Sequence, residues 1–382
     1  MNDRGEKLSV LHIMGPLQPS GMERMFISTG KHFSNENIIN SILGQGETHP
    51  FADDLRQAGY AVHVLPNIDL SRRSRKSLRD LVKAREIDVV HVHTEKNYLQ
   101  TVLACRLALG PRGKVIRTVH NVFMATGFWR VKRFAQALLA DRLVFALIAP
   151  SPDVAANERT LGRSAQVIYN WVDDRYSELA SLRSGRKANE QPLALIVGNC
   201  SDIKNHSRAL RAISATNHHL IHFGNEAGAS QEEIDLLNAL DLQHRLVGRG
   251  THAPDDALKV ADYYAMPSRN EGMPVALAEA LVSGVPAFVS DAPGLRWAKG
   301  LTGVTCLAED DGAWMHALQS GNVGATVAGA GSVDFSAARG ARQYADIYRA
   351  ASTVKIASLR RTAAPKLARV TSSVGAAGDE KE

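Results

Sequence analysis

Two glutamates eight positions apart, Glu271 and Glu279, are the residues of this chain with the clearest potential for chemistry. The sequence around them predicts a buried strand over residues 263–266, a polar turn, and a helix over residues 275–282. Pro274 suits the start of that helix, because its φ angle is fixed and its missing N–H is not needed there. Ligands of parallel sheets lie at the carboxyl ends of strands and anions lie at helix N-termini, so the two carboxylates bracket a predicted ligand site.

Short motifs around these glutamates extend the pattern over about twenty residues: Pro267-Ser268, Glu271-Gly272-Met273-Pro274, Glu279-Ala280 and Gly284-Val285-Pro286. This order resembles the E-x7-E motif of retaining glycosyltransferases with the GT-B fold, of the family 4 type. The resemblance implies that Glu279 accepts hydrogen bonds from ribose hydroxyls and that Glu271 lies near the donor sugar, as nucleophile or as a group that positions hydroxyls. It also implies that Gly272, Met273 and Pro274 contact the donor. The alternative is an ordinary surface helix with one capping glutamate.

A second loop near the start of the chain carries glycines at both ends. A buried strand is predicted over residues 8–14, followed by the loop from Gly15 to Gly21 and a helix from Met22. The loop resembles the glycine-rich loop of the same family, in which backbone N–H groups face the donor diphosphate. The resemblance assigns Gly21 to donor binding, and the alternative is a plain strand-to-helix turn.

Histidines follow two further predicted strands. Residues 87–93 read IDVVHVH and residues 114–119 precede His120. These segments resemble the family's D-V-V-H-x-H and T-x-H strands, which makes His120 the first choice for an active-site imidazole, with His93 second to it. A neutral imidazole there can hydrogen-bond a sugar hydroxyl or help to move its proton. The alternative for His120 is a satisfied core histidine, and for His91 that is the better interpretation.

The loop after the predicted strand at residues 193–197 carries the expected cation. The family usually has an arginine here and a lysine about five residues later, and both hold the diphosphate. Lys204 matches, whereas Asn199 stands where the arginine is expected. Asparagine donates only neutral hydrogen bonds and cannot make the charge-assisted fork of a guanidinium. By the same resemblance, Gly248 lies in the turn against the nucleotide base.

The resemblance covers roughly residues 8–350 and implies an α/β protein of the GT-B fold, with two Rossmann-like, doubly wound domains facing across a cleft. The expected divisions are an acceptor-side domain (1–176), a loose polar linker (177–192), a nucleotide-sugar domain (193–333), a helix that crosses back to the first domain (334–352) and a disordered tail (353–382). The first domain ends with a short motif, residues 167–173, in which Trp171 stands in place of the family's glycine. This exchange predicts a backbone without positive φ, or a filled cleft edge.

Composition is that of a soluble globular protein, with 382 residues, 45% hydrophobic and 22% charged, and a formal charge of +6. Cys105, Cys200 and Cys306 are far apart and odd in number, which predicts a reducing cytoplasm and neither disulfides nor a C-x2-C metal site. The sequence begins without the pattern of a signal peptide, and no apolar run approaches the length of a spanning helix. Basic residues over 71–85 and mixed aromatic and basic residues over 128–134 indicate either solvated or packed helices, or a peripheral contact with an anionic membrane.

The predicted activity is transfer of a sugar, with retention, from a nucleoside diphosphate sugar to a saccharide or lipid-linked saccharide in polysaccharide biosynthesis. UDP-sugars are favoured, with GDP-sugars next. Lys204 and the helix N-terminus after Met273 would stabilise the leaving diphosphate, so no metal is expected. No further cofactor and no nucleic acid partner are expected either. The alternatives are a sugar phosphorylase or nucleotide-sugar epimerase of the same fold, or a non-catalytic partner protein, which Asn199 would favour.

Overall fold

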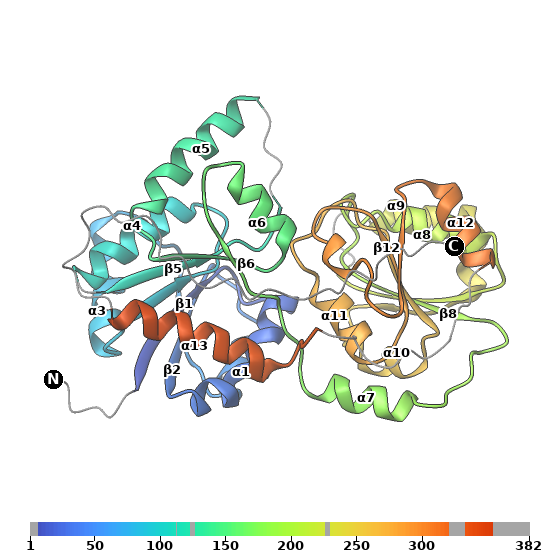
Figure 1. Cartoon of the computed structure of the whole chain (residues 1–382), viewed down its shortest axis with the longest axis horizontal. Coiled ribbons are helices and arrows are strands. Elements are labelled where there is room, and N and C mark those ends of the chain that lie inside the picture. The colour runs from blue at the N-terminus through green and yellow to red at the C-terminus, as the bar shows by residue number, and fades with distance from the viewer. Residues whose placement is uncertain (1–6, 112, 123–126, 226–229, 321–332, 354–382) are drawn as a thin grey trace, which may run out of the picture.

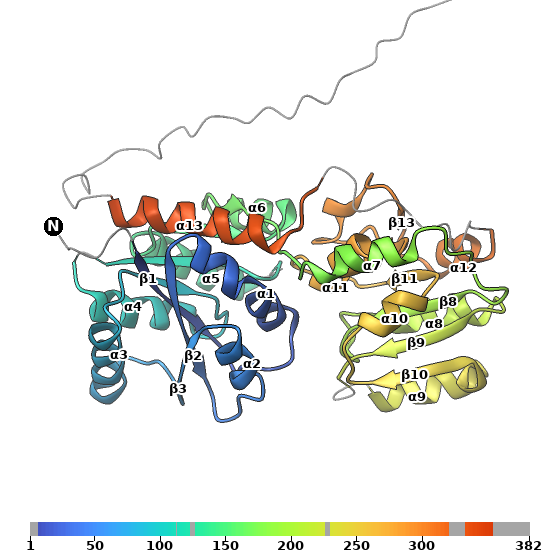
Figure 2. The same cartoon turned by 90° about the horizontal axis from the view of Figure 1, so that it is seen from below.

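The structure is a computed structural model that describes residues 7–111, 113–122, 127–225, 230–320 and 333–353. It consists of two α/β domains side by side (Figures 1 and 2), which confirms the fold predicted from the sequence. Of the tail expected over residues 353–382, all but Thr353 lies outside the described residues.

The first domain is built on a seven-stranded sheet with the order β3-β2-β1-β4-β5-β6-β7, and every pairing is parallel. Alternate residues of β1 face opposite layers: Val10 and Met14 belong to one buried cluster, Leu11 and Ile13 to another. Burial on both faces explains the nearly continuous apolar runs. The strands are β1 Leu8–Met14, β2 Ile38–Gln45, β3 Ala61–Leu65, β4 Val89–Val92, β5 Lys114–Thr118, β6 Ala146–Ala149 and β7 Gln166–Val167.

The second domain repeats this plan with a six-stranded parallel sheet in the order β10-β9-β8-β11-β12-β13. Its strands are β8 Leu193–Val197, β9 His219–Phe223, β10 Leu246–Gly250, β11 Tyr263–Met266, β12 Ala287–Ser290 and β13 Val304–Leu307. In both sheets the chain winds outward from a central strand in one direction and then in the other. The points of reversal lie between β1 and β4 and between β8 and β11, where ligands bind in sheets of this kind.

Helices separate the strands, so each domain is a series of βα units. They are α1 Gly21–Asn35, α2 Ala52–Gln57, α3 Arg72–Ala84, α4 Tyr98–Leu109, α5 Gly127–Asp141, α6 Pro152–Arg159, α7 Arg175–Arg183, α8 His206–Ser214, α9 Ser230–Ala239, α10 Asp255–Val260, α11 Val275–Val282, α12 Asp311–Ser320 and α13 Ala337–Thr353. The sequence predicted α1, α3, α11 and α13 closely.

The predicted loose linker over residues 177–192 is wrong in its first half. Residues 175–183 form α7, which packs on the second domain through Tyr176 and Leu179. Arg183 is also buried, and its guanidinium donates to the carbonyls of Leu258 and Ala261 at 2.7 and 2.8 Å. Most side chains of this segment are polar, but its buried residues recur at the spacing of a helix.

Helix α13 returns from the second domain and covers the first, beside α1 (Figure 2). Trp171, fully buried, lies at this junction, and its indole N–H donates to the carbonyl of Met25 at 2.8 Å. Any side chain at Gly340 of α13 would overlap the indole ring. Trp171 has no positive φ, as expected from its replacement of glycine, and it fills the space between α1 and α13.

Candidate active site

A cavity of about 800 Å³ lies between the two domains, lined by residues from both. Loops after β1, β4 and β5 of the first sheet and after β8, β9, β10 and β11 of the second all contribute to it. Both points of topological reversal therefore open into one space. Of the site residues predicted from the sequence, the lining includes Gly21, His93, His120, Asn199, Lys204, Met273, Pro274 and Glu279.

Two helix N-termini meet in this cavity. Helix α1 begins at Gly21 and α11 begins at Val275, and a Cβ atom on Gly21 would lie 3.1 Å from Cβ of Val275. A side chain at position 21 would therefore require Val275 to shift by a few tenths of an ångström. Pro274 is the N-cap of α11, one position earlier than predicted, and no side chain caps that helix. The N–H groups of its first turn are therefore available to an anion.

Glu279 lies one turn further into α11 and is only 3% exposed. Burial raises the pKa of its carboxyl group to about 7. The positive charge of Arg24 and a hydrogen bond with Tyr176 lower this pKa, but by less than burial raises it. Because it lines the cavity, its carboxylate can accept hydrogen bonds from a bound hydroxyl-bearing ligand. A carboxyl group with a pKa near neutrality makes such binding sensitive to pH.

Glu271 and Lys204 form an ion pair, with 2.7 Å between Nζ and Oε1. Lys204 comes from the loop after β8 and Glu271 from the loop after β11, the two strands that flank the switch point of the second sheet. Lys204 lines the cavity and Glu271 does not. An anion that entered the cavity would therefore compete with Glu271 for the ammonium group of Lys204.

Two of the predicted donor-binding glycines do not line the cavity. Gly272 lies against the backbone of His120 in the other domain, where any side chain would overlap the His120 carbonyl. Its own carbonyl accepts a hydrogen bond from the Ser151 hydroxyl at 2.7 Å. Gly248 lies inside β10, beside the ring of Phe223, and the cavity is instead reached by Thr251 and His252 beyond it. Gly272 thus serves the contact between domains.

Asn199 is exposed at the cavity, and its side-chain oxygen accepts a hydrogen bond from the backbone N–H of Asn225 at 3.1 Å. The side chain therefore joins the loops after β8 and β9. A second cation lines the cavity from an unexpected place, since Arg24 projects from the first turn of α1. The sequence offered a weak signal for Arg24, namely a basic residue two positions after Met22, the first residue of a helix predicted to start at the ligand.

His120, half-buried at the cavity, ends a row of three imidazoles whose other two members, His93 and His12, are buried. Its Nε2 lies 3.1 Å from Nδ1 of His93, whose Nε2 lies 3.2 Å from Nδ1 of His12. Nε2 of His12 lies 2.9 Å from Oδ1 of Asn40. Burial lowers the pKa of His120 and of His12 to about 4 and that of His93 well below its usual value, so all three are neutral at pH 7.

The neutral rings fix one direction of donation. The Asn40 oxygen accepts from His12, so His12 accepts from His93 and His93 accepts from His120. The Nδ1 atom of His120 is then an acceptor rather than a donor. His91, by contrast, is bonded to Tyr348 and Thr118 within the core, both at 2.8 Å, which agrees with its interpretation as a structural residue.

Glu95 fixes the backbone on which His120 lies. One carboxylate oxygen accepts from the His120 N–H at 2.8 Å, and the other accepts from Arg117 at 2.7 Å. The guanidinium of Arg117 also stacks on the ring of Tyr98, 3.7 Å from its centre. Sequence reasoning did not single out Glu95, although it follows the β4 strand at the same edge as His93.

The far end of the cavity has an aromatic wall. Phe223 is the last residue of β9 and His252 follows β10; their ring centroids lie 5.0 Å apart, and both residues line the cavity. Flat apolar ligands bind well beside such rings. Sequence reasoning did not single out either residue of this wall.

Two family models match the chain in succession. Residues 19–176 match Glycosyltransferase Family 4, and residues 180–315 match Glycosyl transferases group 1. EpsF of Bacillus subtilis (strain 168), which is named as a glycosyltransferase, is 25% identical over 346 residues, covering 81% of this chain and 86% of EpsF.

An Escherichia coli enzyme named UDP-Gal:alpha-D-GlcNAc-diphosphoundecaprenol alpha-1,3-galactosyltransferase is 26% identical over 321 residues, covering 77% of this chain and 82% of the enzyme. Among solved structures, Anabaena HepE in complex with UDP and glucose superposes with a TM-score of 0.69 at 18% identity, covering 90% of this chain and 97% of HepE. Within the described residues, no helix combines the length and apolar character that a membrane crossing requires.

Proposed function

This chain belongs to glycosyltransferase family 4 and has the GT-B fold, and we propose that it moves a sugar from a nucleoside diphosphate sugar to a hydroxyl group with retention of anomeric configuration. The observation that carries the proposal is the convergence of Glu279, Lys204 and the uncapped N-terminus of α11 on one cavity. A carboxylate for ribose hydroxyls beside cationic groups for phosphates is the complement of a nucleoside diphosphate. The cavity volume of about 800 Å³ also suits a ligand of that size.

In the proposed complex, the diphosphate lies between Lys204 and the first turn of α11. The bond that breaks joins the sugar C1 to a phosphate oxygen, so negative charge grows on the diphosphate as the reaction proceeds. Lys204 and the helix N–H groups stabilise that charge, and the diphosphate competes with Glu271 for the lysine. Since the protein supplies these positive groups, the proposed reaction needs no metal at the diphosphate.

A UDP-sugar is the favoured donor, with a GDP-sugar next. The support is that the related Escherichia coli enzyme is named for UDP-Gal and that HepE was solved with UDP and glucose. The base would lie toward Phe223 and His252, and the ribose would lie at Glu279 and near Arg24. The sugar would then extend toward the first domain, where Nδ1 of His120 accepts a hydrogen bond from one of its hydroxyls or from the acceptor.

The proposed acceptor is a saccharide or a lipid-linked saccharide of a polysaccharide pathway, as the name of the Escherichia coli relative suggests. Helix α5 of the first domain supports a peripheral position on the cytoplasmic face of a membrane. Its side chains Val131, Phe134, Leu138 and Leu139 are 48–66% exposed. An apolar helix face near basic residues is suited to the headgroup layer of an anionic bilayer. The side chains of Phe128, Trp129 and Arg130 lie outside the described residues.

The first experiment is a thermal-shift screen of the purified protein against UDP, GDP and their sugars. A bound nucleotide at 100 times its dissociation constant adds about 2.7 kcal/mol to the free energy of unfolding. Donors that stabilise are then incubated with a saccharide diphospho-polyprenol acceptor, and the anomeric configuration of the product is read by NMR. Stabilisation without transfer would favour the non-catalytic alternative, phosphate-dependent turnover a phosphorylase, and donor isomerisation without acceptor an epimerase. No response to any nucleotide would contradict the proposal.

A further inference from the structure

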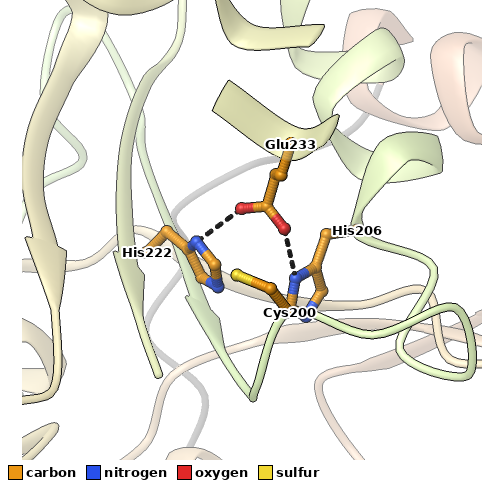
Figure 3. Close-up of side chains that lie close together, drawn as sticks. All are labelled: Cys200, His206, His222 and Glu233. Atoms are coloured by element: carbon orange, nitrogen blue, oxygen red, sulfur yellow. Dashed lines mark hydrogen bonds and ion pairs between the residues drawn. The ribbon is translucent and has the colours of Figure 1, made fainter. Parts of the chain in front are cut away.

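Four side chains of the second domain with metal-ligating atoms lie together outside the donor cavity: Cys200, His206, His222 and Glu233 (Figure 3). They come from four places in the chain, namely the loop after β8, the first turn of α8, the strand β9 and the helix α9. Each offers one ligand atom, and these four atoms all lie within 4.8 Å of one another. The four residues are 2–8% exposed, so the cluster is closed to solvent.

The carboxylate of Glu233 points between the two imidazoles (Figure 3). Its Oε2 lies 3.0 Å from Nδ1 of His206, at hydrogen-bond geometry. Its Oε1 lies 2.7 Å from Nδ1 of His222, but this pair lacks the alignment of a hydrogen bond, and neither atom has another hydrogen-bond partner in the described part of the chain. A close contact between two misaligned polar atoms calls for a third group that both can bind.

The other nitrogen of His222 limits what that group can be. Nε2 of His222 lies 3.2 Å from the carbonyl oxygen of Gly198, and a carbonyl only accepts, so Nε2 carries the proton. In a neutral ring, Nδ1 then presents a lone pair to a carboxylate oxygen, which is repulsive unless a cation lies with them. Metal-bound histidines usually donate their outer N–H to a carbonyl or carboxylate in this way.

We propose that Cys200, His206, His222 and Glu233 bind one structural Zn²⁺ ion. Thiolate, imidazole and carboxylate are the zinc ligands of proteins, and a closed set of four without a water position is typical of structural sites. One thiolate and one carboxylate also balance the charge of the dication, which a buried site requires. Arg249, whose Nη2 lies 4.0 Å from Oε1 of Glu233, stands at the edge of the cluster as a partner for these anionic ligands.

The site spans the loop that the proposed function assigns to the diphosphate. Cys200 and His206 flank Lys204 on either side, and His222 bonds the carbonyl of Gly198 at the start of the loop. Zinc would therefore hold this loop from outside the donor cavity, whereas Lys204 of the same loop lines the cavity. This consequence depends on the proposed function, whereas the metal site does not. The sequence expectation of no metal site rested on cysteine spacing, which does not detect a site with one cysteine.

The test measures metal directly. Protein purified through a tag without histidines, from zinc-supplemented cells, is expected to contain about one zinc per chain by elemental analysis. Reconstitution with Co²⁺ should give a thiolate-to-cobalt charge-transfer band. Cys200→Ser and His222→Gln should lose most of the zinc, and Cys200→Ser should lose the band. Cys105→Ser, at a buried cysteine in α4 of the other domain, is the matched control and should keep both.

Wild-type protein with less than roughly a tenth of an equivalent of zinc and no cobalt band would overturn the proposal, leaving His222 and Glu233 as a pair without a metal. Retention of full zinc by Cys200→Ser would overturn the ligand assignment. The wild-type measurement decides even where a variant fails to fold. It also stands apart from catalysis, because an inactive protein with one zinc would contradict the proposed function alone.

Discussion

Nε2 of His120 lies 3.1 Å from Nδ1 of His93, and this contact sets which nitrogen of the cavity-lining imidazole carries its proton. The row of hydrogen bonds that ends at His120 starts at Asn40. This residue lies in β2 and bonds to His12 in the neighbouring strand β1. A polar residue inside the sheet thereby determines whether the active-site ring accepts or donates.

We call the row of hydrogen bonds from Asn40 through His12 and His93 to His120 the relay. It predicts that Asn40→Leu lowers turnover by an effect at His120. Without the accepting oxygen, His12 has no fixed tautomer, and neither do His93 and His120. Turnover should fall by about tenfold to a hundredfold, approaching the loss of His120→Ala, with nucleotide affinity nearly unchanged. The matched control is Thr118→Val, which removes another buried hydrogen bond from the same sheet, that to His91. If Thr118→Val and Asn40→Leu reduced kcat equally, the effect would be one of stability and the relay would have no role.

The raised pKa of Glu279 predicts pH-dependent donor binding. Burial raises this pKa to about 7. In the proposed complex the ionised form accepts the ribose hydrogen bonds, so the proton must leave before binding. Affinity for a UDP-sugar should be constant above about pH 8 and fall by up to tenfold per pH unit below the pKa. His120 and His12, with pKa values of about 4, do not titrate in this range.

Isothermal titration between pH 6 and 8.5 checks this profile. A UDP-sugar is used because its phosphates do not titrate there. Glu279→Gln should bind more weakly and show no dependence, and Glu279→Ala should weaken nucleotide binding more than Glu271→Ala does, mainly by raising KM. A wild-type profile that is flat, or one that the glutamine variant reproduces, would remove Glu279 from the ribose site.

Lys204 is predicted to carry most of the side-chain charge at the diphosphate. Lys204→Ala should lower kcat by about 10²–10³, while Asn199→Ala, which mainly loses the contact with the Asn225 backbone, should lose much less. Asn199→Arg should tighten binding of UDP and slow its release. Steady-state kinetics and product inhibition measure both. A silent Lys204→Ala would direct attention to Arg24, the other cation described in the cavity.

Added divalent metal is predicted to be unnecessary for turnover. A brief treatment with dilute EDTA should leave kcat unchanged, because in the proposed complex protein groups stabilise the diphosphate. Zinc content is measured on the same samples, so that any loss of the buried ion is seen separately. Activity that disappears with EDTA at constant zinc content and returns with Mg²⁺ or Mn²⁺ would show a catalytic metal.

The exposed face of α5 is predicted to bind anionic vesicles. The double change Phe134→Glu and Leu138→Glu should reduce co-sedimentation several-fold, since it replaces apolar contact with charge repulsion. Leu182→Glu is the control, because Leu182 is 76% exposed on α7 of the other domain. Equal sedimentation of all three proteins would exclude α5 as the membrane contact.

Local patterns were sufficient to predict the strands and helices around the cavity, because apolar runs, the proline before α11 and the glycine after it act within a few residues. They misplaced Gly272, which is constrained by the backbone of His120, about 150 residues away, and not by a ligand. Such a close approach leaves no trace in local periodicity. Arg24 and Glu95 were missed although both belong to the first domain and follow β1 and β4, the neighbouring strands at which its sheet reverses.

The linker shows a different cause of error. Polar composition over residues 177–192 predicted a loose segment, yet Tyr176, Leu179 and Arg183 recur at helical spacing and are buried. Only two of these three buried residues are apolar and the third is a charged arginine, so neither the composition nor the apolar periodicity of the segment indicates this helix clearly. The cluster of Cys200, His206, His222 and Glu233 has no compact spacing at all, so it depends on the fold of the second sheet.

The return of α13 has a consequence for synthesis on the ribosome. Tyr344 and Tyr348 of this helix complete the buried layer around Phe33 and Trp171 of the first domain. A nascent chain that has emerged only as far as residue 336 therefore exposes this apolar layer, although most of the first domain is already outside the exit tunnel. The second domain, which is continuous in sequence, can finish folding before the first, reversing the usual N-terminal order. Truncation just before α13 should consequently yield a chain that engages chaperones through its earliest-made half.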